Sequence, residues 1–333
     1  MKTSFITRSL ATLLAVTLAT LTSAQINNFD SLNGYAAGLE LRLNSEHQNF
    51  YQLRSPQAGF AVGVEGNSTS REVAPATDRL ERENDSNYYG LNASWGTDTW
   101  SIGAALVKID ASSDYLEINS PAPNPTSGKI DSDTIAGQFW ALFTSGDFTF
   151  MGSLTASSTD YDGTRRSDLG ASSANFDGSG SFGFAKVTYD FSVSDNMVLT
   201  PFGGIIWASA EADGFTELGT AADRRIVGNF SSDESNLAVG LRLAAKEGKW
   251  KPSVTIGWLN ELSSDPARIS IKAINGFDLG VGTVPNASDS LFYAGLGLEG
   301  DLDASWSVRG SVDFFTGGEE EQTGFTLGVR RSF

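Results

Sequence analysis

The stretch QTGFTLGVRRSF, residues 322–333, ends the chain and decides the fold. Its large apolar residues fall on one parity: Phe325, Leu327, Val329 and Phe333. The other parity carries small and polar residues, among them Thr326, Gly328 and Arg330. Successive side chains of a strand point to opposite faces, so this period of two predicts a β-strand with one apolar face. An edge strand of a soluble sheet and the closing strand of a membrane barrel both fit this pattern.

The composition excludes several kinds of site. The 333 residues contain no cysteine and one histidine, His47, so zinc or haem sites and cysteine nucleophiles are excluded, and a Ser-His-Asp triad would have to use His47. No motif surrounds His47, and we therefore expect no enzyme activity, no cofactor and no metal. A formal net charge of −17 at pH 7 argues against a nucleic-acid partner.

The first 24 residues have the pattern of a secretory signal peptide. Lys2 and Arg8 form a basic start, residues 10–21 form an apolar core, and Ala24 ends a small-residue cleavage site before Gln25. This core is too short to span a membrane as a helix, and no later stretch approaches the roughly 18 apolar residues that a span needs. We therefore expect an exported chain, and any membrane-spanning part of it has to be a closed barrel.

The rest of the sequence favours the membrane barrel over a soluble sheet. From residue 57 onward, apolar and polar residues alternate in twelve segments, which predict twelve strands of about ten residues, the length of a membrane β-strand. These segments are 58–65, 89–95, 100–106, 135–143, 148–154, 185–191, 197–210, 237–243, 250–258, 292–298, 306–314 and 325–333. Their connections alternate between short and long, as in outer-membrane barrels, which have short periplasmic turns and long extracellular loops. The sequence predicts an all-β fold over residues 57–333, a twelve-stranded antiparallel up-and-down transmembrane barrel.

Some local features are predicted in more detail. In the seventh segment the alternation of apolar and polar residues is irregular around Pro201 and Trp207, which predicts a β-bulge there. Asn275-Gly276 suits a type I′ turn, so the longest loop is expected to contain a β-hairpin. Polar stretches are expected to form the long loops 67–87, 158–178, 213–232 and 263–288.

Residues 25–56 precede the barrel and fit two patterns. One set of apolar residues alternates as in a strand, and another fits one face of a helix. This segment is expected to be either a pore-lining helix or an extra strand.

Two sets of side chains follow from the strand pattern. Charged residues occupy the parity opposite to the apolar one and are expected to face the lumen: Glu65, Arg242, Glu261, Glu299, Arg309, Asp313 and Arg330. They would either pair and hold the shape of the barrel or form a constriction that selects what passes. Aromatic residues flank the short turns, as in a girdle at a membrane interface: Trp95, Trp100, Phe148, Phe191, Trp250 and Trp306.

The C-terminal part resembles the translocator β-domain of autotransporters. The resemblance rests on residues 250–262, 291–317 and 324–333, and includes a proline that enters a strand, a Gly-Trp pair followed by glutamate, a glycine-spaced strand and an inward aspartate. Here these are Pro252, Gly257, Trp258, Glu261, Gly295, Gly297 and Asp313. The resemblance implies a twelve-stranded barrel in outer-membrane lipid. It also implies that the barrel-assembly machinery reads the terminal strand through Phe325, Leu327, Val329 and Phe333.

Two features depart from the family pattern. Arg331 stands where the family usually has an aromatic residue, and only residues 25–56 precede the barrel, so no folded passenger domain is expected. We expect a structural, surface or pore-forming barrel in the cell outer membrane, with residues 25–56 plugging or lining its lumen. A small porin-like channel is the alternative, and an outer-membrane hydrolase is a distant one. The pattern names neither a solute nor a surface partner.

Overall fold

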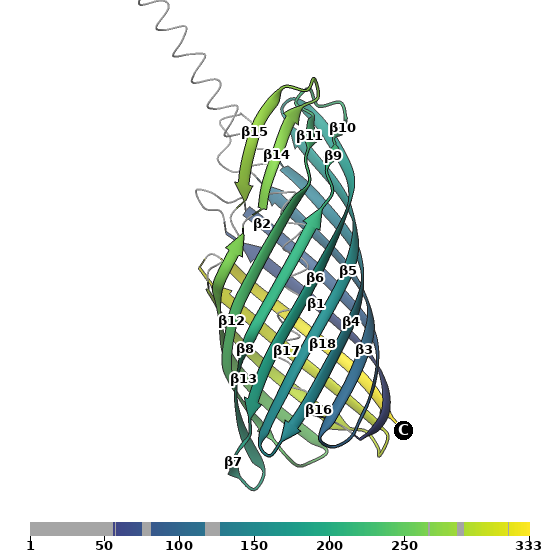
Figure 1. Ribbon diagram of the computed structural model, residues 1–333, viewed down its shortest axis with the longest axis vertical. Helices are drawn as coiled ribbons and strands as arrows, with labels where there is room; N and C mark the ends of the chain where they lie inside the picture. Colours follow the sequence, from purple (N-terminus) through teal and green to yellow (C-terminus); the bar gives the residue numbers. More distant parts are fainter. Residues whose placement is uncertain are drawn as a thin grey trace, which may run out of the picture.

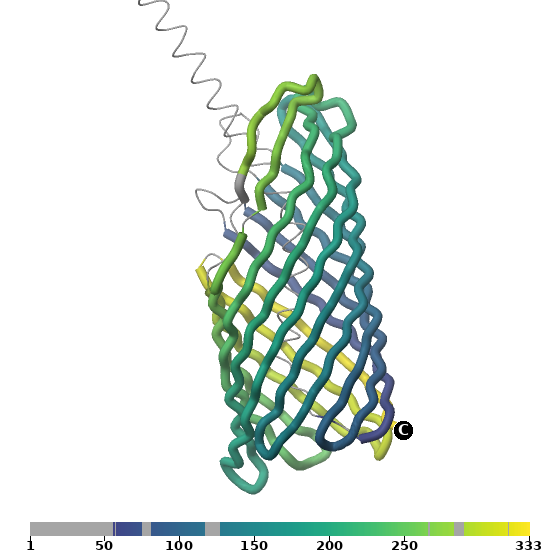
Figure 2. Tube along the Cα trace, in the orientation of Figure 1, coloured from purple at the N-terminus to yellow at the C-terminus, as the bar shows by residue number. Residues whose placement is uncertain are grey.

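The chain folds into a closed barrel of antiparallel strands (Figures 1 and 2). A computed structural model describes residues 56, 58–74, 81–116, 127–265, 267–284, 290–318 and 320–333. Its twelve long strands are β1 (Gly59–Val73), β2 (Glu81–Gly96), β3 (Trp100–Leu116), β4 (Ser127–Ser145), β5 (Phe148–Ser167), β6 (Gly170–Tyr189), β8 (Met197–Ala212), β12 (Phe230–Ala245), β13 (Trp250–Asp265), β16 (Ser290–Asp301), β17 (Trp306–Gly317) and β18 (Glu320–Ser332). Each pairs with the next, and β1 pairs with β18, which closes the barrel. The predicted fold class is confirmed.

Side chains alternate between a lipid-like outer face and a buried inner face. On β3, Leu106 is 63% exposed on the outside, whereas its neighbour Val107 is 3% exposed on the inside. Large apolar side chains are exposed around the whole outer wall, the reverse of a soluble fold and the arrangement that a surrounding hydrocarbon layer favours. Within the described ranges, no helix has the length and apolar character needed to cross a membrane.

The two ends of the barrel differ. Short turns at residues 97–99, 146–147, 195–196, 246–249 and 302–305 join the strands at one end, where the C-terminus also lies (Figure 1). We call this the short-turn end and the opposite one the loop end. The predicted signal peptide and residues 25–55 lie outside the described residues, so no structure is assigned to them.

Two of the predicted polar loops are wrong, because the strands continue through them. β1 and β2 occupy most of residues 67–87, and β5 and β6 run through 158–178 to a tight turn at Asp168-Leu169. The outward residues of these extensions are polar, so the hydrophobic alternation that signals a membrane strand stops before the strand does. The predicted sixth segment is also divided, because Phe191 belongs to a short separate strand, β7 (Phe191–Ser194).

A second, four-stranded sheet covers part of the loop end (Figure 1). Its order is β15-β14-β11-β9, with β9 (Phe215–Thr216), β11 (Arg225–Val227), β14 (Ala267–Ala273) and β15 (Asp278–Val284). The short strand β10 (Leu218–Gly219) pairs with the first residues of β6. We call residues 213–229 and 267–284, which carry this sheet and β10, the hood.

The β14–β15 hairpin was predicted correctly, but its turn was not. Gly276 alone has a positive φ, 85°, whereas a type I′ turn would require one at Asn275 as well. The N–H of Gly276 donates to the carbonyl of Ala273 at 2.8 Å, which closes a four-residue turn that ends on the glycine. The bulge predicted near Pro201 and Trp207 is also wrong, since β8 pairs with β6 and β12 without a register shift.

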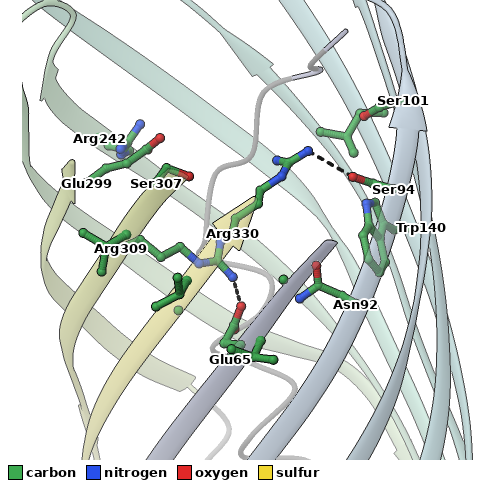
Figure 3. Close-up of a pocket in the computed structure, with 16 residues that line it drawn as sticks. Glu65, Asn92, Ser94, Ser101, Trp140, Arg242, Glu299, Ser307, Arg309 and Arg330 are labelled. Carbon is green, nitrogen blue, oxygen red and sulfur yellow. Dashed lines mark hydrogen bonds and ion pairs between the residues drawn. The ribbon is translucent and has the colours of Figure 1, made fainter. Parts of the chain in front are cut away.

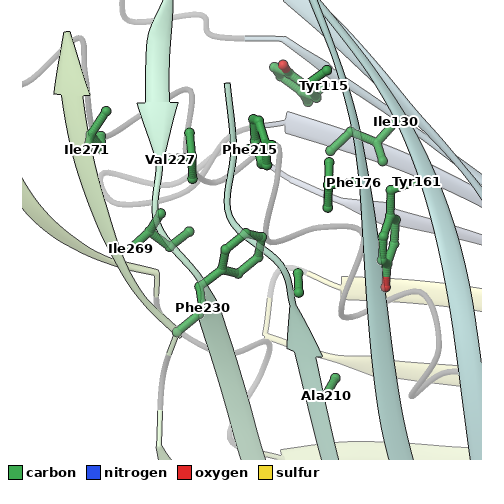
Figure 4. Close-up of a cluster of buried hydrophobic side chains, with 13 residues drawn as sticks. Tyr115, Ile130, Tyr161, Phe176, Ala210, Phe215, Val227, Phe230, Ile269 and Ile271 are labelled. Carbon is green, nitrogen blue, oxygen red and sulfur yellow. The ribbon is translucent and has the colours of Figure 1, made fainter. Parts of the chain in front are cut away.

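The inner face of the hood packs on the inner wall of the barrel (Figure 4). Ile269 and Ile271 of β14 belong to one buried apolar cluster with Tyr161 of β5 and Phe176 of β6. The ring of Phe176 stacks on those of Tyr161 and Phe215, with centroid distances of 4.8 and 4.5 Å. An apolar core therefore occupies the part of the loop end that the hood covers, whereas the ends of β1 to β5, β17 and β18 line a cavity of about 1090 Å³ with many charged side chains.

Candidate functional site

A charged cluster lies inside the barrel near the short-turn end (Figure 3). It lines a cavity of about 150 Å³ and contains five of the seven charged residues predicted to face the lumen: Glu65, Arg242, Glu299, Arg309 and Arg330. Serines and an asparagine from β2, β3 and β17 complete the polar wall: Asn92, Ser94, Ser101 and Ser307. Because each of these residues lies near the end of its strand at the short-turn end, the barrel brings them to a similar height.

Glu65 and Arg309 form an ion pair between strands that are not neighbours. Arg309 on β17 donates from Nη2 to Oε2 of Glu65 on β1, and β18 lies between the two strands. Both residues stand opposite Gly328 in the strand registers. A Cβ atom at Gly328 would lie 3.1 Å from Nε and 3.2 Å from Cγ of Arg309. The glycine therefore leaves the space through which the arginine reaches the carboxylate.

Arg330 reaches across the wall in the same direction, one strand further on. Its Nη2 donates to the hydroxyl of Ser94 on β2 at 3.0 Å, passing over β1. Arg242 on β12 and Glu299 on β16 line the same cavity and interact electrostatically. The wall of this cavity carries three arginines and two glutamates, so its formal charge has the opposite sign to that of the whole chain.

The other two predicted charges lie further along the barrel. Asp313 is buried and accepts hydrogen bonds from the phenol of Tyr293 and, at 2.8 Å, from the hydroxyl of Ser311. It lines a second cavity of about 90 Å³ that shares several residues with the first. Glu261 lines neither cavity and accepts a hydrogen bond from Ser264 at 2.6 Å.

The lumen also has an apolar wall that the sequence did not predict. Inward-facing Trp140, Phe184, Phe202 and Ile206 form a buried cluster on β4, β6 and β8. Strict alternation assigned large apolar residues to the lipid face only. The missed signal is the run FWALF at residues 139–143, where both parities are apolar.

The predicted interface aromatics lie beside the short turns. Trp95, Phe148, Phe191, Trp250 and Trp306 are exposed on the outer wall, and Trp100 is half-buried. The rings of Trp95 and Trp100 meet edge to face at 5.0 Å across one such turn. Their location is compatible with a membrane interface, which remains an interpretation.

The terminal strand presents Phe325, Leu327 and Phe333 outward, while Val329 is half-buried. The N–H of Phe333 donates to the carbonyl of Phe60 at 2.8 Å. The guanidinium of Arg331 lies over two rings, 5.4 Å from the centroid of Trp306 and 4.7 Å from that of Phe333. This arginine thus packs against aromatic residues at the position where the family pattern has an aromatic.

The seam between the first and last strands has further polar links. Nε of Arg71 lies 2.6 Å from Oε1 of Glu320, and both side chains are almost completely buried. Nearer the middle of the barrel, Asn67 donates to the hydroxyl of Thr326 at 2.8 Å.

A buried ion network fixes the hood to the barrel. Arg165 on β5 donates from Nε and Nη2 to the two carboxylate oxygens of Glu217 at 3.0 and 2.8 Å, and from Nη1 to Asp223 at 2.7 Å. The side chains of Arg165 and Glu217 are 1% and 0% exposed. Burial acts to raise the pKa of Asp223, but its hydrogen bond and ion pair with Arg165 outweigh burial and hold that pKa below the usual value. This network was not predicted, because its residues fall in the predicted loops 158–178 and 213–232.

Among the residues that the structure describes, no group of three or more histidine, cysteine, aspartate or glutamate side chains could hold a metal ion.

The family model of the autotransporter β-domain matches residues 58–313 of this chain.

The chain belongs to the autotransporter β-domain family.

Solved structures show the same fold for this family member. The translocator domain of the autotransporter NalP from Neisseria meningitidis has a TM-score of 0.70 at 15% identity, covering 92% of this chain and 99% of that chain. The β-domain of the Bordetella autotransporter Brka has a TM-score of 0.59 at 15% identity, covering 83% and 100%. The toluene transporter TbuX from Ralstonia pickettii has a TM-score of 0.51 at 10% identity, covering 84% and 90%. A search of curated proteins finds no match.

The autotransporter β-barrel fold indicates an outer-membrane location. In such barrels the short turns face the periplasm and the longer connections face outward. The charged cluster then lies toward the periplasmic side, and the hood lies outside the cell.

Proposed function

We propose that this autotransporter-type barrel is a structural or surface protein whose lumen is closed at rest, with residues 25–56 plugging or lining it after removal of residues 1–24. The observation that carries the proposal is the apolar core beneath the hood, which narrows the outer end of the barrel along β3 to β12. A path for hydrated solutes needs polar, wet walls, which this core does not offer. The other part of this end holds a cavity of about 1090 Å³ with charged side chains from β1 to β5, β17 and β18 in its wall, and residues 25–56 would close that remaining path.

The inner end supports the same proposal. The charged cluster leaves a cavity of about 150 Å³, room for roughly five water molecules. The Glu65–Arg309 pair crosses the wall beside this cavity and holds both side chains in place. The cluster then serves first to hold the shape of the barrel, with the outer-membrane lipid and the barrel-assembly machinery as the general partners of the fold.

Planar-bilayer conductance tests the proposal. We expect the mature chain to give no steady current, and a variant that lacks residues 25–56 to give stable open steps. Both proteins should show heat-modifiable gel mobility, which reports an intact barrel. Open steps of equal size from both proteins would contradict closure by this segment.

A porin-like channel is the second candidate, and the charge of the inner cavity favours it. Three arginines face two glutamates there, so a conducting state would prefer anions. The reversal potential in a potassium chloride gradient should then have the sign of chloride permeation. An open pore without this preference would show that the cluster does not select the solute.

A further inference from the structure

Four carboxylates form a row across the rim of the barrel at the loop end. They belong to directly opposite residues on four neighbouring strands: Glu321 of β18, Glu72 of β1, Glu83 of β2 and Asp114 of β3. All four side chains are exposed and line the cavity of about 1090 Å³. Within the described ranges, no basic side chain forms an ion pair with any of them. Because like charges on opposite residues destabilise a sheet, a bound cation would stabilise this part of the rim.

The row is bounded on both sides. In the strand registers, Thr316 of β17 stands beyond Glu321, and Lys129 of β4 stands beyond Asp114. The cavity has two further basic residues in its wall, and both lie off the row: Arg82 and Arg166. The row therefore presents four negative charges between one neutral and one positive end.

A buried phenol lines the same cavity. Tyr115 is 4% exposed, and its hydroxyl has no hydrogen-bond partner among the residues that the structure describes. A Cβ atom at Gly128, which also lines the cavity, would lie 2.0 Å from this hydroxyl, so the phenol lies over the glycine. A buried polar group without a partner is unfavourable, and a polar ligand in the cavity would supply the missing hydrogen bond.

The spacing of the row indicates the class of ligand. Neighbouring strands lie about 4.8 Å apart, so the four carboxylates extend over roughly 14 Å. Two nitrogens joined by three or four carbons lie about 5–6 Å apart when the chain is extended, as single-bond lengths of about 1.5 Å require. A linear polyamine therefore places one ammonium group at each carboxylate. A single compact metal ion does not fit, since the acidic side chains in the described ranges form no group that could hold one.

We propose that the rim binds a linear tetraamine of the spermine class from outside the cell. Each of its ammonium groups pairs with one carboxylate of the row, and an amine N–H donates a hydrogen bond to the phenol oxygen of Tyr115. The bound ligand removes the repulsion between the four strands. Binding at the rim is separate from closure of the lumen, because the row lies on exposed side chains at the outer end of the strands.

Isothermal titration calorimetry of the full chain in detergent at low ionic strength tests the proposal. We expect one spermine per barrel, bound about tenfold more tightly than putrescine, which reaches only two carboxylates. Replacing two carboxylates, in Glu72→Gln with Glu83→Gln, should weaken spermine binding about tenfold for the same reason. Tyr115→Phe, which loses one hydrogen bond, should weaken it about fivefold. Unchanged affinity in this variant would overturn the part assigned to the phenol.

Asp160→Asn with Asp177→Asn is the matched control. These exposed aspartates stand directly opposite each other on β5 and β6 and lie outside the cavity, so the change in charge and the relief of repulsion are the same. The control should bind spermine like the unaltered chain, and heat-modifiable mobility should show that each barrel is folded. Equal weakening in the two double variants, or displacement of spermine by Mg²⁺ at equal ionic strength, would show binding of counter-ions without a site and overturn the proposal.

Discussion

Arg309 of β17 binds Glu65 of β1 by reaching over β18, the strand that lies between them. The closing strand is thus held by its own backbone pairs on both sides and by a side-chain bridge above its lumenal face. Gly328 is the residue of β18 beneath this bridge. The sequence pattern placed all three residues on the inner face but gave no sign that they act together.

Gly328→Val should displace the bridge. The new side chain would start within 3.2 Å of Arg309, so the arginine has to move away from Glu65. We expect a loss of about 1–3 kcal/mol in the free energy of unfolding, as for other overpacked sites. Urea unfolding in detergent, followed by tryptophan fluorescence, measures it. Gly310→Val is the control, because a Cβ there meets only one backbone oxygen at 3.5 Å. Equal losses in the two variants would exclude the bridge as the cause.

Removing either partner of the bridge should have unequal effects. Arg309→Gln leaves the Glu65 carboxylate, 5% exposed, without its counter-charge, and we expect a loss of about 3 kcal/mol. Glu65→Gln leaves Arg309, which is 31% exposed and can turn toward the lumen, so a smaller loss of about 1 kcal/mol is expected. A double-mutant cycle in the same unfolding assay gives the coupling between them. Additive effects would show that the two side chains are not coupled.

Arg165→Met should loosen the hood and leave the membrane part of the barrel intact. The change leaves Glu217 buried without its bidentate partner, a cost of about 3–5 kcal/mol concentrated at the loop end. Hydrogen exchange by mass spectrometry should show faster exchange in residues 213–229 and unchanged exchange in β16 to β18. Arg166→Met, the exposed neighbour on the same strand, is the control and should change neither region. Uniformly faster exchange along the barrel would contradict a local role.

The hood should also respond to acid. The pKa of Asp223 is held below its ordinary value of 3.8, so its ion pair with Arg165 stabilises the hood above that value. This stabilisation is lost as the pH falls through the lower, folded-state pKa. Exchange in residues 213–229 should therefore stay constant from neutral pH down to about pH 4, after correction for intrinsic rates, and rise below it. In Asp223→Asn the rise should be weaker. An identical acid response in both proteins would assign it to another group.

Deletion of Phe333 should reduce assembly. The deletion removes the last hydrogen bond to Phe60 and one of the two rings beneath Arg331. We expect less heat-modifiable protein in the outer-membrane fraction at an equal rate of synthesis. Arg331→Gln, which loses only the cation–π contacts, should cost about 0.5–1 kcal/mol and leave assembly nearly unchanged. If both variants assemble like the unaltered chain, the terminal phenylalanine is not the assembly signal.

The membrane part of this fold was predictable because the lipid imposes a strict rule on it. Each of the twelve predicted segments lies on one of the twelve long strands, although Ala58, Phe191 and Phe333 fall just outside the bounds of theirs. Outside the membrane that rule ends. The outward residues of β5 beyond Leu154 are mostly polar, so the sequence pattern of this last part of the strand predicts a loop.

The candidate site was predictable only in part. Parity identifies residues that point inward, such as Glu65 and Arg309, because a charge on the lipid face would be costly. Parity does not show that β1 and β17 lie on either side of the same strand, β18. It therefore could not predict that Glu65 pairs with Arg309. The Arg165–Glu217 contact joins residues from two predicted loops, and no local pattern of sequence encodes such a contact.

The seam between β1 and β18 has a consequence for how the chain must fold. Ala61 near the start of the described barrel pairs with Ser332 at its end. Until β18 has been synthesised, β1 has no partner on one side, and its unpaired backbone groups could not be placed in hydrocarbon without a large cost. Closure depends on contacts of very high sequence separation, which form slowly. Synthesis and insertion of this barrel are therefore separate events in time, and the finished chain has to be kept from aggregating during the interval.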